Sequence, residues 1–485
     1  MLLRLVMQLV RWGERTPIDR SECEWSRAVL VSLSLVLAVG VFVPGALSTR
    51  SSNFPRPLFG GPRNYATATA AWAVATADLN GDAKPDIVAV DVNSDAVSAL
   101  INRGRGTFSR ARVYRSRVRD GGSWAVAIGD LNGDHRPDLA TADPDANTAT
   151  ILINTGDGHF RRSAAYPTGA APQDVSVADL NGDRSLDLVT ANKDASTVSV
   201  LLNRGDGTFE TRRGYGTGRA SKPESVAIAD LNDDGKPDLA TANFEDTVSI
   251  FLNRGDGSFQ TRSDLRAGSG PRSVAIADLN RDRRPDVVTA NTSTGETVDS
   301  VSVFLNKGSG LFRRQLDYRK AGLELGFGSV AIGDLNGDGR PDVATGNDTD
   351  PGTDSILINR GDGRFQPRFD YVTGRGEEAS GARTIAIADL NGDGTPELVT
   401  ARDTTKSVSV LINALGRCAV PDVMRKTVRA AKRELARTNC RLGKIRLGYS
   451  NRVKTGRVLS ERPRAGTVLP RGGKVDVVVS RGRKR

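Results

Sequence analysis

The chain has 485 residues, of which 68 are Lys or Arg and 57 are Asp or Glu, so its formal net charge is +11. This length allows two or three domains, or one large closed β architecture with a smaller partner domain. Glycine is abundant, at 52 residues, and aromatic residues make up only 5%. That balance favours short strands and tight turns and argues against long packed helices.

An apolar segment near the N-terminus is the first element. Residues 28–43, AVLVSLSLVLAVGVFV, carry no charge, follow several arginines and precede Pro44 and Gly45. Residues 1–48 therefore read as an export signal cleaved after Ser48. The alternative is an uncleaved signal anchor, because extension to Leu47 gives twenty residues, enough to span a bilayer. Either way the rest of the chain is exported, and it meets a membrane only through this segment if the segment stays uncleaved.

The middle of the chain is built from an internal repeat. A nine-residue acidic segment such as DLNGDAKPD occurs seven times, and the successive starts are 52, 49, 51, 48, 56 and 55 residues apart. The copies begin at Asp78, Asp130, Asp179, Asp230, Asp278, Asp334 and Asp389. A period near fifty predicts a propeller, a solenoid or an array.

Each copy contains the pattern of four short strands. In the fourth copy, SVAIAD precedes the acidic segment, DLATAN follows it, TVSIFLN comes after a polar loop, and a segment equivalent to FETRRGY closes the unit. The alternation of side chains predicts strands in these places. Four-stranded units arranged radially protect their edges, so we expect an all-β, seven-bladed β-propeller over residues 59–414.

The two ends of this region predict how the ring closes. Six copies carry a Phe and, six residues later, an aromatic residue or Leu, as in Phe209 and Tyr215, but the seventh copy lacks this fourth strand. Phe59 and Tyr65 show the same spacing ahead of the first copy. We therefore expect residues 59–68 to form the outer strand of the last blade.

The segment NRGDGTF, residues 203–209, contains the tripeptide Arg-Gly-Asp of many adhesion ligands. Corresponding places read NTGDGHF, NRGDGSF, NKGSGLF and NRGDGRF. The glycines persist while the Arg and the Asp are replaced, which suits a tight hairpin that needs positive φ angles. We interpret the segment as a turn and not as an adhesion signal.

The acidic segments are candidate calcium loops. Positions 1, 3, 5 and 9 carry oxygen-bearing side chains, and Ca²⁺ takes six to eight oxygen ligands, here including the carbonyl of position 7. The alternative is an Asx-rich turn without metal. The candidate ligands are Asp78, Asn80, Asp82, Asp86, Asp130, Asn132, Asp134, Asp138, Asp179, Asn181, Asp183, Asp187, Asp230, Asn232, Asp234, Asp238, Asp278, Asn280, Asp282, Asp286, Asp334, Asn336, Asp338, Asp342, Asp389, Asn391, Asp393 and Glu397.

The seven loops differ at position 6, where a sharp turn favours glycine. Glycine is present there in copies four, six and seven, but copy seven ends in Glu397 in place of Asp. We expect the tightest sites in copies four and six and weaker sites in copies three and five.

The DLNGD loops followed by NRGDGTF-type turns resemble FG-GAP/VCBS repeats, the units of the integrin α-subunit propeller, of many bacterial surface proteins and of some lectins. The resemblance covers roughly residues 59–413. It implies that calcium loops join the first and second strands on one face, that the metal is structural, and that ligands meet the opposite face.

The opposite face is then formed by residues that precede each first strand. Six residues before the leading Asp of each copy stand Trp72, Trp124, Gln173, Glu224, Arg272, Gly328 and Arg383. Two tryptophans near charged side chains suit stacking on a sugar or on an aromatic group of a peptide. The alternative is that these residues only pack between blades.

The C-terminal region changes composition. Residues 418–485 contain 20 Lys or Arg against 4 Asp or Glu. Its segments VPDV, GRVLSERPRAGT and GGKVDVVVSRG resemble a PASTA domain, and several members of that family bind peptidoglycan. We expect an α+β domain over residues 418–482 with a basic tail, 483–485. Its helix would have Val428, Ala431 and Leu435 on one face, and its strands would lie around Ile445, Val458 and Val475.

Two cysteines in this region, Cys418 and Cys440, are 22 residues apart and suit a disulfide in an exported domain; the alternative is two buried thiols. The basic charge suits anionic wall polymers. A nucleic-acid partner is disfavoured, because export removes it and the basic residues lack interleaved aromatic residues.

The function that these features favour is binding. The chain contains only two His and no HExxH, GxSxG or Walker A motif. We expect a secreted or wall-associated, calcium-stabilised, non-catalytic binding or adhesion protein whose partner is a cell-wall polymer, a glycan or a protein ligand. The alternative is a polysaccharide-active lyase or hydrolase that uses carboxylates alone.

Overall fold

The computed structural model describes residues 59–483 except 93, 95, 116–121, 293–299, 320–325, 349–351, 374–381 and 470–471. The N-terminal segment with its predicted export signal lies outside the described residues. The chain divides into two units between Asn53 and Phe54, and the elements described below belong to the second. Within the described ranges, no helix has the length and apolar character needed to cross a membrane.

The described residues form seven four-stranded antiparallel sheets, numbered here by the repeat whose acidic loop they carry. Sheet 1 consists of β2 (Ala71–Ala77), β3 (Asp86–Asp91), β4 (Ala96–Leu100) and β5 (Arg112–Arg115). Sheet 2 consists of β6 (Ala125–Gly129), β7 (Asp138–Asp143), β8 (Thr148–Gly156) and β9 (His159–Pro167). Sheet 3 consists of β10 (Pro172–Ala178), β11 (Asp187–Asn192), β12 (Thr197–Leu201) and β13 (Arg213–Gly216).

Sheets 4 to 6 follow the same order. Sheet 4 consists of β14 (Pro223–Ala229), β15 (Asp238–Asn243), β16 (Thr247–Phe251) and β17 (Ser263–Arg266). Sheet 5 consists of β18 (Pro271–Ala277), β19 (Asp286–Asn291), β20 (Ser300–Asn306) and β21 (Phe312–Arg319). Sheet 6 consists of β22 (Gly326–Gly333), β23 (Asp342–Asp348), β24 (Thr353–Leu357) and β25 (Phe369–Val372). Sheet 7 contains β26 (Ala382–Ala388), β27 (Glu397–Arg402), β28 (Ser407–Leu411) and, from the other end of the chain, β1 (Arg63–Ala66).

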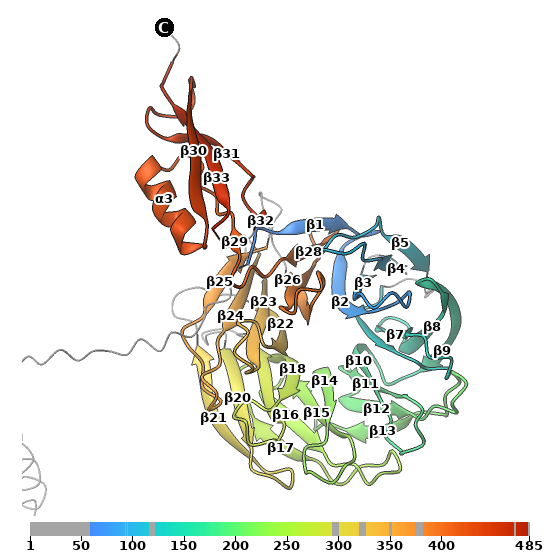
Figure 1. Cartoon of the computed structure of the whole chain (residues 1–485). Helices are drawn as coiled ribbons and strands as arrows, with labels where there is room; N and C mark the ends of the chain where they lie inside the picture. Colours follow the sequence, from blue (N-terminus) through green and yellow to red (C-terminus); the bar gives the residue numbers. More distant parts are fainter. Residues whose placement is uncertain are drawn as a thin grey trace, which may run out of the picture. The chain divides into compact units, whose positions relative to one another are not determined.

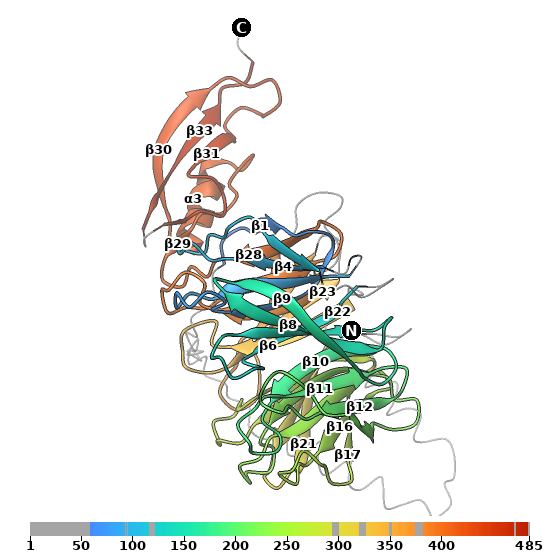
Figure 2. The ribbon, with the colours of Figure 1, turned by 90° about the vertical axis from the view of Figure 1, so that its right-hand side faces the viewer.

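The sheets are arranged around a common axis in a propeller-like β fold (Figures 1 and 2). The first strand of each sheet contacts the first strand of the next, from β2 and β6 through to β22 and β26, and β26 contacts β2. The second strand of each sheet is buried along almost its whole length, as in β15, DLATAN. Such a strand is covered on both faces, which explains its short, nearly continuous run of small and branched residues.

The closing strand lies where the sequence predicted it. β1 pairs antiparallel with β28, with Tyr65 opposite Val408, and Phe59 forms a bridge with Asn413. The fourth strands begin later than expected in most sheets. In sheet 4, for example, Phe259 makes an isolated bridge to Asn253, and regular pairing resumes only at Ser263.

The C-terminal domain is a small α+β unit. Its three-stranded sheet has the order β30 (Arg441–Gly448), β33 (Lys474–Ser480), β31 (Val458–Arg462), and β29 (Cys418–Ala419) pairs with β32 (Val468–Leu469). Helix α3 (Val428–Arg437) begins at Thr427, whose side chain accepts a hydrogen bond from the N–H of Ala430. The helix buries Ala431 and Leu435 against Val475 and its neighbours. Cys418 and Cys440 form a disulfide.

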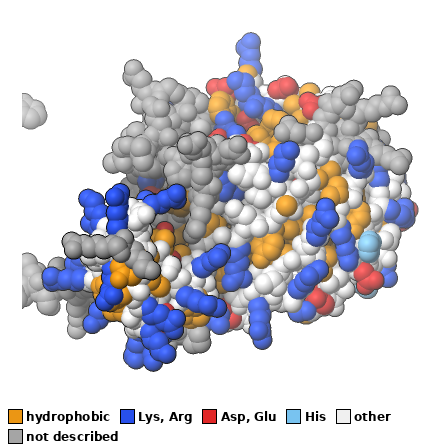
Figure 3. Space-filling model, turned by 90° about the horizontal axis from the view of Figure 1, so that it is seen from above, with side chains coloured by type: hydrophobic (Ala, Val, Ile, Leu, Met, Phe, Trp, Pro, Cys, Tyr) orange, Lys and Arg blue, Asp and Glu red, His pale blue; other side chains and the backbone are white. Residues whose placement is uncertain are grey.

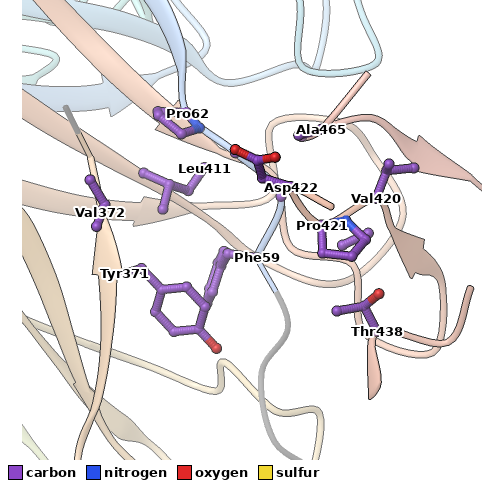
Figure 4. Close-up of a pocket in the computed structure, with 14 residues that line it drawn as sticks. Phe59, Pro62, Tyr371, Val372, Leu411, Val420, Pro421, Asp422, Thr438 and Ala465 are labelled. Atoms are coloured by element: carbon purple, nitrogen blue, oxygen red, sulfur yellow. The ribbon is translucent and has the colours of Figure 1, made fainter. Parts of the chain in front are cut away.

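The closing segment also contacts the C-terminal domain. Gly60 and Gly61 lie against Gly466, so closely that a Cβ on Gly60 would lie 3.0 Å from the carbonyl oxygen of Gly466. Phe59 packs edge-on against Tyr371, with ring centroids 5.2 Å apart. Together with Val420 and Pro421 these residues surround a pocket of about 250 Å³ (Figure 4). The segment that joins the first and last sheets therefore also supports the start of the C-terminal domain.

Candidate functional site

The acidic loops join the first and second strands of every sheet, and backbone amides organise each loop. In sheet 1 the carboxylate of Asp78 accepts hydrogen bonds from the N–H groups of Gly81, Asp82 and Ala83 at 2.7–3.0 Å. The carboxylate of Asp82 accepts from the N–H of Lys84 at 3.1 Å. The bonds from positions 5 and 6 to position 1 and from position 7 to position 5 recur in all seven loops.

The carboxylate at position 9 has a different environment. Asp86 is fully buried and accepts hydrogen bonds from the N–H groups of Leu79 at 2.9 Å and Asn102 at 2.6 Å. Burial, and secondarily the charges of Asp82 and Asp78, raise its pKa to about 6. The same pair of amide bonds holds position 9 in the other six sheets. This carboxylate therefore ties each loop to the end of the third strand of its own sheet.

Sheet 7 departs from this pattern. The longer side chain of Glu397 also accepts a hydrogen bond from Nδ2 of Asn391 at 2.7 Å. Burial, with a contribution from Asp393, raises the pKa of Glu397 to about 8. In the loops of sheets 2, 3, 5 and 6, Nδ2 of the position 3 Asn instead donates to the Asp at position 5. The Glu therefore draws the position 3 side chain away from the centre of its loop.

The backbone of the loops turns sharply at two positions. Position 6 has a φ between 61° and 81° in all seven loops, including Ala83, His135, Arg184 and Arg283. Position 4 also has a positive φ, and there Asp233 and Arg281 replace the glycine found in the other five. This geometry explains the preference for glycine at position 6. The same requirement at position 4 was not predicted from the sequence, and copy four, one of the two copies expected to bind calcium most tightly, lacks glycine there.

An asparagine that the sequence analysis did not single out connects neighbouring sheets. Nδ2 of Asn203, the first residue of NRGDGTF, donates to the carbonyl oxygen of Leu131 in the acidic loop of sheet 2 at 2.8 Å. The equivalent bond, 2.8–2.9 Å long, occurs at all seven junctions between sheets. The signal was available, because this Asn is constant in the seven copies while the next residue varies.

The donor set of the acidic loops bears on whether a metal ion can bind there. In the described part of the chain, no group of three or more His, Cys, Asp or Glu side chains is arranged so that it could hold a metal ion. Each loop nevertheless offers only hard oxygen donors, which are the ligands that Ca²⁺ takes. The carboxylates at positions 1 and 5 also lie near enough to raise the pKa of the carboxylate at position 9. The chemistry of the donor set therefore fits a hard divalent cation.

The Arg-Gly-Asp segment forms a turn on the same side as the acidic loops. Arg204 N–H donates to the carbonyl of Thr208 at 2.9 Å, and Asp206 accepts from the N–H and the hydroxyl of Thr208 at 2.9 and 2.6 Å. Gly205 and Gly207 have φ angles of 87° and 79°. These hydrogen bonds lower the pKa of Asp206. Its carboxylate therefore acts within the turn itself.

A pocket lies at the opposite end of the first strands. It has a volume of about 440 Å³ and is lined by residues from all seven sheets, among them the seven that stand six positions before each leading Asp. We call these seven the collar: Trp72, Trp124, Gln173, Glu224, Arg272, Gly328 and Arg383. The collar is about 20 Å from the acidic loops, since the strand between them rises about 3.3 Å per residue. We call this space the axial pocket.

One side of the axial pocket is aromatic. The rings of Trp72 and Trp124 have centroids 4.9 Å apart and an interplanar angle of 45°. The guanidinium of Arg383 lies 4.6 Å from the centroid of Trp72 and pairs with Asp348 at 2.8 Å and Asp403 at 2.7 Å. Trp72 is therefore held by a cation whose own charge is neutralised.

The other side of the axial pocket is charged. Lys193, which was not predicted, pairs with Glu224 at 2.7 Å. The guanidinium of Arg272 lies 5.8 Å from the ring centroid of Phe244. Asp174, which was also not predicted, accepts hydrogen bonds from the N–H groups of Val175 and Val226, both at 2.9 Å, and burial raises its pKa.

Comparisons with known proteins agree with this architecture. A model of the FG-GAP-like repeat matches residues 78–141, 130–190, 179–241, 230–289, 278–345 and 334–400, and a PASTA domain model matches residues 419–481.

Among solved structures, an Agrocybe aegerita lectin, studied for its recognition of non-reducing terminal N-acetylglucosamine, is 22% identical with a TM-score of 0.45 over 63% of this chain and 80% of the lectin. Two structures of BBS1N in complex with ARL6DN, soaked with mercury and with lead, are 12% and 11% identical. Their TM-scores are 0.51 and 0.50 over 74% of this chain and 97% of theirs, and the similarity concerns the fold alone.

Proposed function

Because the chain belongs to the FG-GAP-like repeat family and ends in a PASTA domain, we propose that it is an exported, non-catalytic binding module of the cell surface or wall. Domains of these two kinds are typical of extracellular and wall-associated proteins. In this proposal the repeats form a seven-bladed propeller over residues 59–414 that presents a ligand-binding pocket, and the basic domain at residues 418–482 adds affinity for wall polymers.

The observation that carries this proposal is the collar. The same position of every repeat lines one pocket, and the side chains there are diverse: two indoles, an amide, an acid, two guanidinium groups and a glycine. A position that served only the packing between sheets would repeat one residue type, as the inter-sheet asparagine does. Concave sites with an aromatic wall and a few converging polar groups are typical of ligand binding.

The state of the carboxylates in the axial pocket favours binding over hydrolysis. Asp174 accepts backbone N–H groups with both oxygens, and Glu224 is paired with Lys193. Carboxylate-only glycosidases need one carboxyl group free to donate a proton and a second free to act on the other face of the sugar. Both carboxylates here already have partners within the protein.

We assign the acidic loops to Ca²⁺ with a structural role. In sheet 1 the ligands would be the side chains of Asp78, Asn80, Asp82 and Asp86 and the carbonyl of Lys84, and the equivalent residues would serve in the other loops. The bound cation would supply the positive charge that offsets repulsion among these carboxylates. Since the loops lie about 20 Å from the axial pocket, we expect the cation to stabilise the fold without taking part in ligand binding.

The C-terminal domain supplies the positive charge. Residues 418–485 carry 20 basic and 4 acidic side chains. In the view of Figure 3, Lys and Arg side chains outnumber Asp and Glu side chains. Anionic polymers are attracted to such a surface over a distance of about 10 Å at ordinary salt.

An array of glycans, wall polymers and wall peptides tests this proposal. The full chain, with calcium and with chelator, is compared with a Trp72→Ala/Trp124→Ala variant. We expect saturable binding of one polymer class by the wild type, loss of that binding in the variant, and a polymer of unchanged length after incubation. Release of shortened products would favour the polysaccharide-active enzyme, and equal binding by the variant would place the ligand elsewhere.

A further inference from the structure

We infer that the axial pocket takes an acidic sugar residue, with the apolar face of the sugar ring against the Trp72–Trp124 pair and its carboxylate at Arg272. This inference rests on the proposed binding function and names the ligand class of the same pocket. It depends on which polar groups in the pocket already have partners and which do not.

Arg272 is the cation whose charge is not neutralised. No ion pair joins it to a carboxylate among the described residues, and its Nε is buried without a hydrogen-bond partner there. Its guanidinium instead lies over the ring of Phe244. In contrast, Lys193 pairs with Glu224, and Arg383 pairs with two aspartates. A buried N–H without a partner is costly, and a carboxylate accepts two parallel bonds from a guanidinium.

The aromatic pair faces Arg272 across the axis. The sheets follow one another in sequence order around the ring, so sheet 5, which carries Arg272, lies across from sheets 1 and 2, which carry the tryptophans. Beneath the indoles, positions that hold Ser or Thr in sheets 4 to 7 hold Ala73 and Ala125. The wall on that side is therefore apolar, which suits the C–H face of a sugar.

Next to Arg272 the collar carries no side chain, because the backbone of sheet 7 lies so close to Gly328 that an added Cβ would clash with the carbonyl oxygen of Arg383. Gly328 of sheet 6 presents no side chain, while Gln173 and the Lys193–Glu224 pair line the remaining arc with groups that can bond hydroxyls. The pocket volume of about 440 Å³ falls within the roughly 300–1,000 Å³ of small-ligand sites. An apolar wall, a hydroxyl-binding arc and one unneutralised guanidinium together fit a ring that has a C–H face, hydroxyls and a carboxylate.

Tryptophan emission provides a direct measurement. The chain has four Trp, and only Trp72 and Trp124 follow the N-terminal segment. In a full chain with Trp12→Phe and Trp25→Phe, all Trp emission arises from the collar. Cellobiouronic acid and cellobiose are the probes, because they differ only by a carboxylate in place of a hydroxymethyl group. We expect saturable changes in emission with both and an affinity about tenfold higher for the acid, as one charge-assisted pair provides.

Variants of this reporter chain separate the possible outcomes. Arg272→Gln is expected to bring the two affinities within about twofold of each other, because it removes the charge-assisted pair. Arg161→Gln, which removes an exposed charge from β9, is expected to leave the preference intact. Circular dichroism checks that both variants are folded.

Equal affinity of the wild type for the two sugars, or a preference that survives Arg272→Gln, would overturn the inference and leave the proposed binding function standing. The same holds if benzoate binds more tightly than either sugar, since that indicates an aromatic carboxylate. If neither disaccharide changes the emission while a polymer still binds in the array, the acidic-sugar inference is wrong. If no array member binds, the proposed function fails with it.

Discussion

At the scale of single residues, position 6 of the acidic loops shows a conflict between sequence and backbone. Seven loops adopt the left-handed conformation there, but four use a residue with a Cβ. Such a residue costs about 1–2 kcal/mol in this conformation. At Gly235, which occupies the same position, an added Cβ would have no other atom within 4 Å. The cost at this site therefore comes from the φ angle and not from a clash.

Exchanging these residues should change stability in opposite directions. We expect Arg283→Gly to raise the free energy of unfolding by about 1 kcal/mol and Gly235→Ala to lower it by about the same amount. Urea denaturation of the two variants beside the wild type measures both effects. Arg283 is exposed, so little packing is lost. A destabilising Arg283→Gly would contradict the explanation by backbone strain.

The buried carboxylates at position 9 predict a pH dependence. In the metal-free protein the pKa of Glu397 is about 8, against an ordinary value of 4.5. The folded state therefore holds a proton that the unfolded state has lost between these values, so this contribution to stability is complete below pH 4.5 and is lost as the pH rises through 8.

In chelator, we expect the free energy of unfolding of the wild type to fall between about pH 5 and pH 8, and Glu397→Gln to reduce that slope. Urea denaturation at a series of pH values measures it. With calcium, which binds the ionised form, the slope should diminish or reverse. A slope unaffected by the substitution would show that Glu397 does not titrate in this range.

At the scale of elements, the hairpin turn of each repeat contains some residues that the fold needs and others that can be replaced. The glycines and the turn conformation could be predicted, because positions with positive φ angles favour glycine. The inter-sheet bond of Asn203 could not, because its partner Leu131 is 72 residues away and a contact at that separation depends on how the sheets pack.

Substitutions in this turn should separate the two roles. We expect Asn203→Ala to destabilise the protein by about 1–3 kcal/mol, because it leaves buried carbonyl groups such as that of Leu131 without a partner. Arg204→Thr with Asp206→Ser, residues found in other copies, should change stability by less than about 0.5 kcal/mol and leave adhesion to animal cells or wall material unchanged. Selective loss of adhesion in the folded double variant would show that Arg-Gly-Asp acts as an adhesion signal.

In two neighbouring sheets, one residue each departs from the repeat, and the two departures have opposite charge. Arg402, at the end of β27, stands where other sheets have Asn or Asp, and Asp354, in β24, stands where they have Val or Ala. Both side chains are fully buried, and each affects the pKa of the other. Arg402 donates to the carbonyl of Thr373 at 2.8 Å, and Asp354 accepts from Thr400 at 2.7 Å.

The two changes should therefore be coupled. Asp354→Val alone removes the stronger of the two carboxylate charges that act on the buried guanidinium, and we expect it to cost about 3–5 kcal/mol. Asp354→Val with Arg402→Asn restores the pattern of the other sheets and should lie within about 1.5 kcal/mol of the wild type. A double-mutant cycle from urea denaturation measures the coupling. Additive effects would mean that the two charges stabilise the sheets independently.

At the scale of the whole molecule, the sequence predicted the features that repeat: the strands, the acidic loops, the closing strand and the positions of the collar. It did not predict features set by single departures between distant copies, such as the unneutralised charge of Arg272 or the Arg402–Asp354 pair. The reorientation of Asn391 by Glu397 was equally hidden, because it depends on the length of one side chain inside a packed loop. The repeat therefore determines the scaffold, and the residues that depart from it, such as Arg272 and Glu397, distinguish one sheet from the next.

In the proposed function, calcium in loops on one face stabilises the ring that carries the axial pocket on the other. Thermal unfolding of the full chain with Trp12→Phe and Trp25→Phe, followed by the emission of Trp72 and Trp124 in calcium and in chelator, measures this stabilisation. Binding to the folded state alone raises stability by mass action, so we expect a markedly higher midpoint in calcium, with one cooperative transition at the collar. An identical midpoint in calcium and in chelator would contradict it.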